Sequence, residues 1–159
     1  MEVDVAVLGG GPGGYTAAIR AAQLGAKVAC VEREPELGGT CLRIGCIPTK
    51  AWVQTAFALK EAEHTFDKLG VKLGGFQLEF GKANEWKDGV VKQMTSGVAS
   101  LFKANGVEWV KGTGTFKDAH TIAVEGGEDV TFKHAIVATG SFPLRPPIEG
   151  LDSERCVDS

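Results

Sequence analysis

The sequence predicts an α/β fold, in which a Rossmann-like parallel sheet with helices is joined to an antiparallel β-meander. The first observation is an apolar strand that leads directly into a glycine-rich turn and a helical pattern. The second is another apolar strand straight after that helix, and the third is a later group of short alternating runs. With 159 residues, 43% of them hydrophobic, and a net charge of −3, the chain is expected to be compact and ordered.

The first element is a βαβ unit at the start of the chain. Val3–Leu8 is short and rich in β-branched residues, as expected of a buried strand, and a helix is predicted over Tyr15–Leu24 with Gly25 just beyond its end. Ala26–Glu32 is a second apolar strand. A strand, helix and strand in this order place the two strands parallel.

Two long helices are predicted next. One runs from about Pro48, a favoured first-turn residue, to Leu69, with Gly70 ending it. The other runs from about Lys82 to Ala104 and repeats its apolar residues along one side.

The last third of the chain is predicted to be mostly β-structure. Val107–Lys111 is a strand, and three short runs after it have the alternation of an antiparallel meander. These runs are 112–117, 120–124 and 130–132. Residues 135–140 are predicted to form a separate buried strand that ends at Gly140, followed by a proline-rich extended exit.

Composition excludes several classes of partner. The chain has neither a basic tract nor an acidic tail, which argues against nucleic acid or a membrane surface as the main partner. Its first residues are acidic where a secretory signal would be basic, so we expect a cytoplasmic protein. In such a protein the four cysteines are not expected to be structural staples.

The glycine-rich turn has the spacing of a dinucleotide-binding fingerprint, Gly9-x-Gly11-x-x-Gly14, with Glu32 at the end of the next strand. In this pattern the glycines allow a tight turn, close approach of a pyrophosphate and close helix packing, while the acid accepts hydrogen bonds from a ribose. An acid there favours NAD or the ADP half of FAD over NADP. The alternative is a flexible turn beside a surface glutamate.

Cys41 and Cys46 are five residues apart, with Gly39, Gly45 and Pro48 around them. In a straight helix this spacing is too wide for a disulfide, so the two can bridge only if the segment bends. A strained, small-ring disulfide would suit a redox couple. The spacing is poor for zinc, and no metal is expected. Two unrelated core cysteines are the alternative, and Cys30 is expected to be a small buried hydrophobe.

Together with the glycine turn and Ala138-Thr139-Gly140, the Cys41–Lys50 segment resembles the FAD-binding part of the pyridine nucleotide-disulfide oxidoreductases. The resemblance covers essentially the whole chain and is greatest to the branch that oxidises dihydrolipoamide. Arg43 and Ile44 stand where this family commonly has Asn and Val, which leaves their contacts open.

The resemblance implies a role for each matching residue. Cys41 would exchange with the dithiol substrate, Cys46 would lie next to the flavin, and Lys50 would lie near the flavin ring. Glu32 and Arg33 would contact the adenosine part of FAD. The other residues expected to bind FAD are Gly9, Gly11, Pro12, Gly13, Gly14, Gly39, Thr40, Gly114, Ala138, Thr139, Gly140 and Ser141.

The resemblance also implies what lies outside this chain. Residues 1–159 would be the N-terminal part of an FAD-binding domain, and other domains would supply the NAD site, the catalytic base and the homodimer contacts. The expected partner is the lipoyl domain of a 2-oxoacid dehydrogenase complex. One strand of the sheet is expected to be missing, which would leave an open edge. A stand-alone flavin- or nucleotide-binding module, or a reductase for another disulfide such as glutathione or mercuric reductase, is the alternative.

Overall fold

The strands form a single sheet in the computed structural model, which describes residues 1–158 and leaves Ser159, the last residue of the predicted domain, outside the described residues. The strand order is β3-β2-β1-β6-β5-β4, with β1 to β3 and β6 parallel and β4 and β5 antiparallel to their neighbours. The strands are β1 (Glu2–Leu8), β2 (Val28–Glu32), β3 (Glu108–Lys111), β4 (Gly114–Asp118), β5 (Thr121–Val124) and β6 (Val130–Val137). This arrangement confirms the predicted α/β fold.

Helix α1 (Pro12–Gln23) connects β1 to β2 and packs on the sheet. It begins three residues before the predicted start because Gly11 is its N-cap and Pro12 occupies the first turn, where a missing N–H is harmless. The glycine turn and the helix start are therefore one continuous structure.

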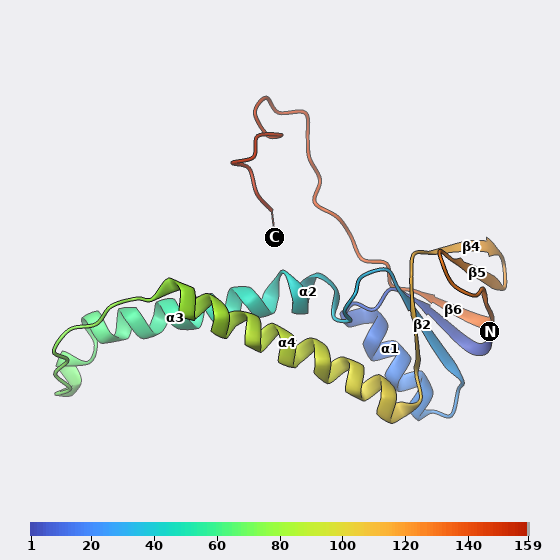
Figure 1. Cartoon of the computed structure of the whole chain (residues 1–159), viewed down its shortest axis with the longest axis horizontal. Coiled ribbons are helices and arrows are strands. Elements are labelled where there is room, and N and C mark those ends of the chain that lie inside the picture. Colours follow the sequence, from blue (N-terminus) through green and yellow to red (C-terminus); the bar gives the residue numbers. More distant parts are fainter. Residues whose placement is uncertain (159) are drawn as a thin grey trace.

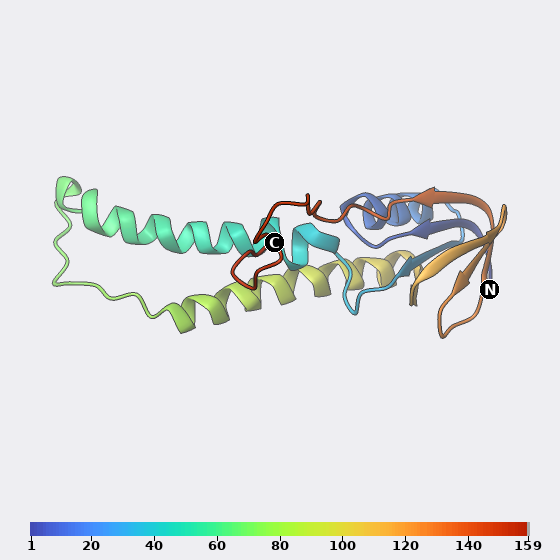
Figure 2. The ribbon, with the colours of Figure 1, turned by 90° about the horizontal axis from the view of Figure 1, so that it is seen from above.

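The long connection from β2 to β3 contains α2 (Gly39–Arg43), α3 (Cys46–His64), a 3₁₀ turn (Asp67–Leu69) and α4 (Phe80–Asn105). Helix α3 thus ends earlier than the helix predicted over 48–69. Gly70, in a left-handed conformation, does end the helical region. Helix α3 and the N-terminal part of α4 lie side by side and project away from the sheet as an arm, while the C-terminal part of α4 packs on the sheet (Figures 1 and 2).

Strand β6 corrects the prediction of two separate strands over 130–132 and 135–140. It is one strand, which pairs with β5 at residues 130–131 and with β1 along residues 131–137. Its second half is not buried, since Val137 is 63% exposed. Pairing with β5 stops near Phe132, so in the part of the chain that the structure describes no strand pairs with the rest of this edge.

The sheet has an apolar core on each face. On one face Val7, Val28 and Cys30 pack with Phe102 of α4 and with α1. On the other face, residues of β1 and β2 pack with Ile122 and Phe132 of the meander. None of the helices within residues 1–158 combines the length and apolar character needed to cross a membrane.

Candidate functional site

A cavity of about 710 Å³ lies where β1 and β2 end and where α1, α2 and β4 begin. All but four of the predicted cofactor-binding residues line it, and the four exceptions are Gly14, Cys41, Cys46 and Lys50. The predicted residues that line it are Gly9, Gly11, Pro12, Gly13, Glu32, Arg33, Gly39, Thr40, Gly114, Ala138, Thr139, Gly140 and Ser141. Segments separated by more than a hundred residues therefore meet at one place.

Bare backbone forms part of the wall of this cavity. A Cβ atom on Gly14 would lie 1.7 Å from the carbonyl oxygen of Gly9, so only glycine lets α1 start so close to β1. Gly39 has a φ of +57°, and a Cβ there would lie 2.7 Å from the Cα of Gly11. The Gly38 N–H also donates to the Gly10 carbonyl over 2.9 Å. The first turns of α1 and α2 are thereby held against each other.

Glu32 is buried at the end of β2 and fixes the glycine turn. One of its carboxylate oxygens accepts from the Gly10 N–H at 2.6 Å, and the other accepts from the Glu34 N–H at 2.9 Å. Sequence reasoning assigned Glu32 to a ribose and missed this second role, for which the sequence holds no clear signal. Each oxygen keeps a further acceptor position, so the two roles are compatible.

The far wall of the cavity depends on β1 and the core beneath it. The Ala138 N–H donates to the Leu8 carbonyl at 2.8 Å, which continues the pairing of β6 with β1 and brings residues 139–141 to the cavity. A Cβ on Gly114 would lie 2.5 Å from Leu8 Cδ1, so glycine there lets β4 cross closely over the core.

The two cysteines of the motif lie at a break between helices. Helix α2 ends at Arg43 and α3 begins at Cys46, so the segment bends as a bridge between Cys41 and Cys46 would require. In this structure both cysteines are free thiols. A hydrogen bond with Cys46 raises the pKa of Cys41, burial adds to this, and the nearby Lys50 charge opposes it. Cys41, Cys46 and Lys50 thus form a second group, and their predicted redox role stays a prediction.

Cys30 is separate from this pair and fully buried, as predicted. Burial, followed by the Glu32 charge, raises its pKa to about 12. A thiol that stays protonated at neutral pH is a poor nucleophile, so Cys30 is a core residue rather than a second redox group.

The cavity suits a dinucleotide. The start of α1 presents free N–H groups with no acidic side chain in its first turn, which favours an anion. Glycine backbones allow a phosphate to approach closely, and an acid lies at the end of β2 for a ribose. These features fit the FAD that the sequence predicts.

Glu34 and Arg43 are among ten lining residues that were not predicted to bind the cofactor. Glu34 and Arg43 form an ion pair of 3.0 Å at the edge of the cavity. Only their opposite charges indicate this ion pair in the sequence, because the two residues are nine positions apart.

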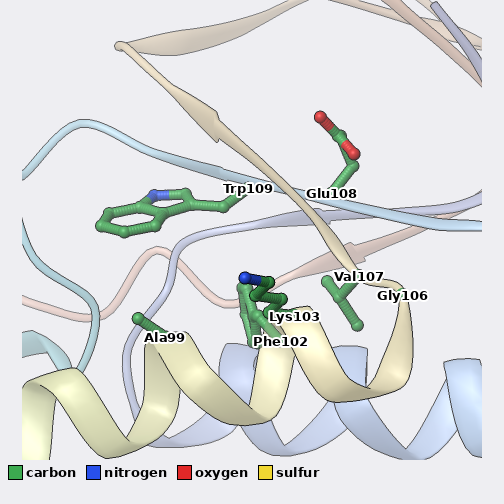
Figure 3. A pocket seen from close by; sticks show the side chains of 7 residues that line it. All are labelled: Ala99, Phe102, Lys103, Gly106, Val107, Glu108 and Trp109. Atoms are coloured by element: carbon green, nitrogen blue, oxygen red, sulfur yellow. The ribbon is translucent and has the colours of Figure 1, made fainter.

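A smaller cavity of about 360 Å³ lies elsewhere, between the C-terminal end of α4 and β3. Trp109 and Lys103 lie on opposite sides of it in Figure 3. None of the predicted site residues lines it, and no cysteine does.

Comparison with known proteins agrees with this geometry. The profile of the pyridine nucleotide-disulphide oxidoreductases matches residues 3–159. The chain is 48% identical over 150 residues to a dihydrolipoyl dehydrogenase of Geobacillus stearothermophilus, covering 92% of this chain and 32% of that protein. It is 43% identical over 162 residues to a leghemoglobin reductase of Vigna unguiculata, covering 99% of this chain and 31% of that protein.

A solved structure is similar as well. It is the Cu(II) complex of the HOCl-induced flavoprotein disulfide reductase RclA from Escherichia coli, with a TM-score of 0.74 and 25% identity. The match covers 96% of this chain and 32% of that one, so the chain spans about a third of the length of the proteins it resembles. The family match covers nearly the whole chain, the relatives agree with it, and the chain has the glycine turn and the cysteine motif described above. This chain therefore belongs to the pyridine nucleotide-disulphide oxidoreductases.

Proposed function

We propose that this chain is the flavin-binding part of a dihydrolipoyl dehydrogenase, which oxidises dihydrolipoamide and reduces NAD⁺. The observation that carries the proposal is that α2 joins the two groups of predicted residues. Its first residues, Gly39 and Thr40, line the dinucleotide cavity, and Cys41 follows directly. The first cysteine of the pair and part of the dinucleotide site therefore lie in the same short helix, and Cys46 begins the next one.

The cysteines would take electrons from the substrate by thiol–disulfide exchange. Starting from a Cys41–Cys46 disulfide, a substrate thiolate attacks Cys41 Sγ and Cys46 leaves as a thiolate. The second substrate thiol, as its thiolate, then displaces Cys41, so the substrate becomes a cyclic disulfide and both cysteines are reduced. Two electrons and two protons have left the substrate.

The remaining residues would hold and tune the cofactor. FAD, when bound, supplies an acceptor for two electrons from the reduced pair. The α1 start and the glycines would face its phosphates, and Glu32 would accept from a ribose hydroxyl. The Lys50 ammonium, on the first turns of α3, already acts on Cys41 electrostatically and would stabilise negative charge that develops near it.

Flavin content and substrate oxidation test the proposal directly. The protein that carries this sequence should show a flavin absorption spectrum and release FAD on denaturation. It should form NADH from dihydrolipoamide and NAD⁺. Protein without flavin contradicts the proposal. Flavin-containing protein that instead reduces another disulfide in a substrate panel replaces it with the related reductase.

Thiol counting tests the role of the cysteines. Under denaturing conditions, a mild reductant should expose two further thiols in the parent protein as purified. Cys41→Ser should show the same thiol count before and after reduction, and Cys30→Ser should still gain two. A parent count that reduction leaves unchanged contradicts a Cys41–Cys46 couple.

The isolated 159-residue chain should form no NADH from dihydrolipoamide, because its relatives are about three times longer and the resemblance places the NAD site and the base elsewhere. Turnover comparable to that of an ordinary dehydrogenase would refute this. Lipoyl-domain binding, homodimer formation and a cytoplasmic location belong to the same proposal. A stop codon directly after Ser159 would favour a stand-alone flavin module.

A further inference from the structure

Arg43 lies between the two cysteines of the motif and also borders the dinucleotide cavity. It is the last residue of α2, three and four positions after Thr40 and Gly39. Residues with this spacing share one side of a helix. All three line the cavity, so this side of α2 faces it.

The Arg43 side chain is mostly buried and has one charged partner. It is 20% exposed, and its Nη2 atom lies 3.0 Å from Oε2 of Glu34. A guanidinium has five N–H donors in a fixed plane. Among residues 1–158, no other acceptor receives a hydrogen bond or ion pair from Arg43. Most of its donors therefore remain for a ligand.

Glu34 has other contacts that hold it in place. Its backbone N–H donates to Glu32, and its second carboxylate oxygen lies 3.3 Å from Nε of Arg33. The guanidinium of Arg43 is thus linked through Glu34 to the same acid that fixes the glycine turn. A cation held in this way loses little conformational freedom when it binds a ligand.

The cations around the cavity can accommodate an anionic ligand at Arg43. The charged lining residues are Glu32, Glu34, Asp158, Arg33 and Arg43, and Asp158 is paired with Arg145 outside the lining. A diphosphate adds negative charge, which the start of α1 and a partly desolvated guanidinium can offset. Glu32 accepts hydrogen bonds through both of its carboxylate oxygens and would meet a neutral ribose rather than a phosphate.

We infer that Arg43 is a phosphate-binding residue of the dinucleotide site and that Glu34 positions it. This inference rests on the proposed flavin-binding function and adds a specific contact to it. The residue that departs from the common Asn of the motif thereby links the redox segment to the cofactor phosphates. A purely structural ion pair between α2 and the end of β2 is the competing explanation.

The test is ligand binding by the apoprotein prepared from the full protein. Titrations with FAD and ADP, and competition by adenosine, are compared among the parent, Arg43→Gln, Arg43→Lys, Glu34→Gln and Arg20→Gln. Arg20 is a matched control, because it is an exposed arginine of α1 whose side chain donates a hydrogen bond to Gln23 and does not line the cavity. Each titration is repeated at several salt concentrations, and circular dichroism verifies that each variant is folded.

Phosphate binding predicts a specific pattern. Arg43→Gln should weaken FAD and ADP about 10-fold to 100-fold, as expected for charge-assisted hydrogen bonds, and leave adenosine within about 3-fold. The salt dependence of ADP binding should become shallower. Arg43→Lys should recover part of the affinity, Glu34→Gln should lose less than Arg43→Gln, and Arg20→Gln should match the parent.

Two results overturn the inference while leaving the proposed function intact. In the first, the parent binds FAD and the Arg43→Gln variant binds both FAD and ADP as tightly as the parent does. The other is an equal loss for FAD, ADP and adenosine in both Arg43→Gln and Glu34→Gln, which indicates a structural ion pair. A parent apoprotein that binds no FAD overturns the proposed function and the inference together.

Discussion

The sheet region and the α3–α4 arm both contain large apolar side chains but bury them to different extents. In the sheet region Val7 of β1 and Ala18 of α1 are fully buried, and both faces of the sheet have a core. In the arm Trp52, Phe57 and Phe80 are each about half exposed, at 45%, 58% and 60%. An apolar helical pattern therefore predicts a helix in both regions, but it predicts burial only in one.

The arm is stabilised by local contacts between its two helices. The rings of Trp52 and Phe80 lie 6.4 Å apart, and the Lys87 ammonium lies 5.3 Å from the Trp52 ring centre. Such contacts contribute about 1 kcal/mol each, less than the burial of a large side chain in a core. Stability should therefore depend strongly on substitutions in the sheet region and weakly on those in the arm.

The largest contrast is expected between glycines of the two regions. Gly14→Ala should destabilise the protein by at least the usual overpacking cost of about 1–3 kcal/mol and abolish flavin binding, because its Cβ would meet backbone at 1.7 Å. Gly89→Ala in α4, where nothing lies within 4 Å, should stabilise by up to about 1 kcal/mol. Urea denaturation measures both. Equal effects would remove the distinction between the regions.

A second contrast is expected between two phenylalanines. Phe102→Ala, at the buried end of α4, should cost about 3–5 kcal/mol because it leaves a cavity between α4 and the sheet. Phe57→Ala in the arm should change the free energy of unfolding by about 0.5 kcal/mol or less. Thermal unfolding of both variants tests this, and a large loss for Phe57→Ala would show that the arm is buried in the protein as it exists.

The smallest expected effect concerns Cys30. Burial raises its pKa from 9.0 to about 12, so above pH 9 the unfolded chain releases a proton that the folded chain keeps. Its contribution to stability is complete below pH 9 and is lost as the pH rises toward about 12. The parent should therefore lose more stability between pH 8 and pH 10.5 than Cys30→Ala does. Identical losses in the two proteins would contradict the raised pKa.

The sequence was most informative where local rules determine structure. The spacing of Gly9, Gly11 and Gly14 predicted residues at the turn beside the cavity, although α1 begins at Pro12, three residues before its predicted start. It was least informative where pairing is long-range. The break expected between 130–132 and 135–140 was wrong because β1 pairs continuously along β6. The ion pair of Arg43 with Glu34 also depends on tertiary structure, since no periodicity connects the two residues.

The pairing of β1 with β6 has a consequence for how this chain folds. The first strand to be synthesised must wait for one that begins at Val130, and the Met1 ammonium group contacts the Asp129 carbonyl at 2.6 Å. Contacts so distant in sequence close late and slow folding. During translation β1 can associate with β2, but its other edge stays unpaired until residues 130–137 emerge, and unpaired strand edges promote aggregation. The nascent chain should therefore depend on chaperones most strongly in this interval.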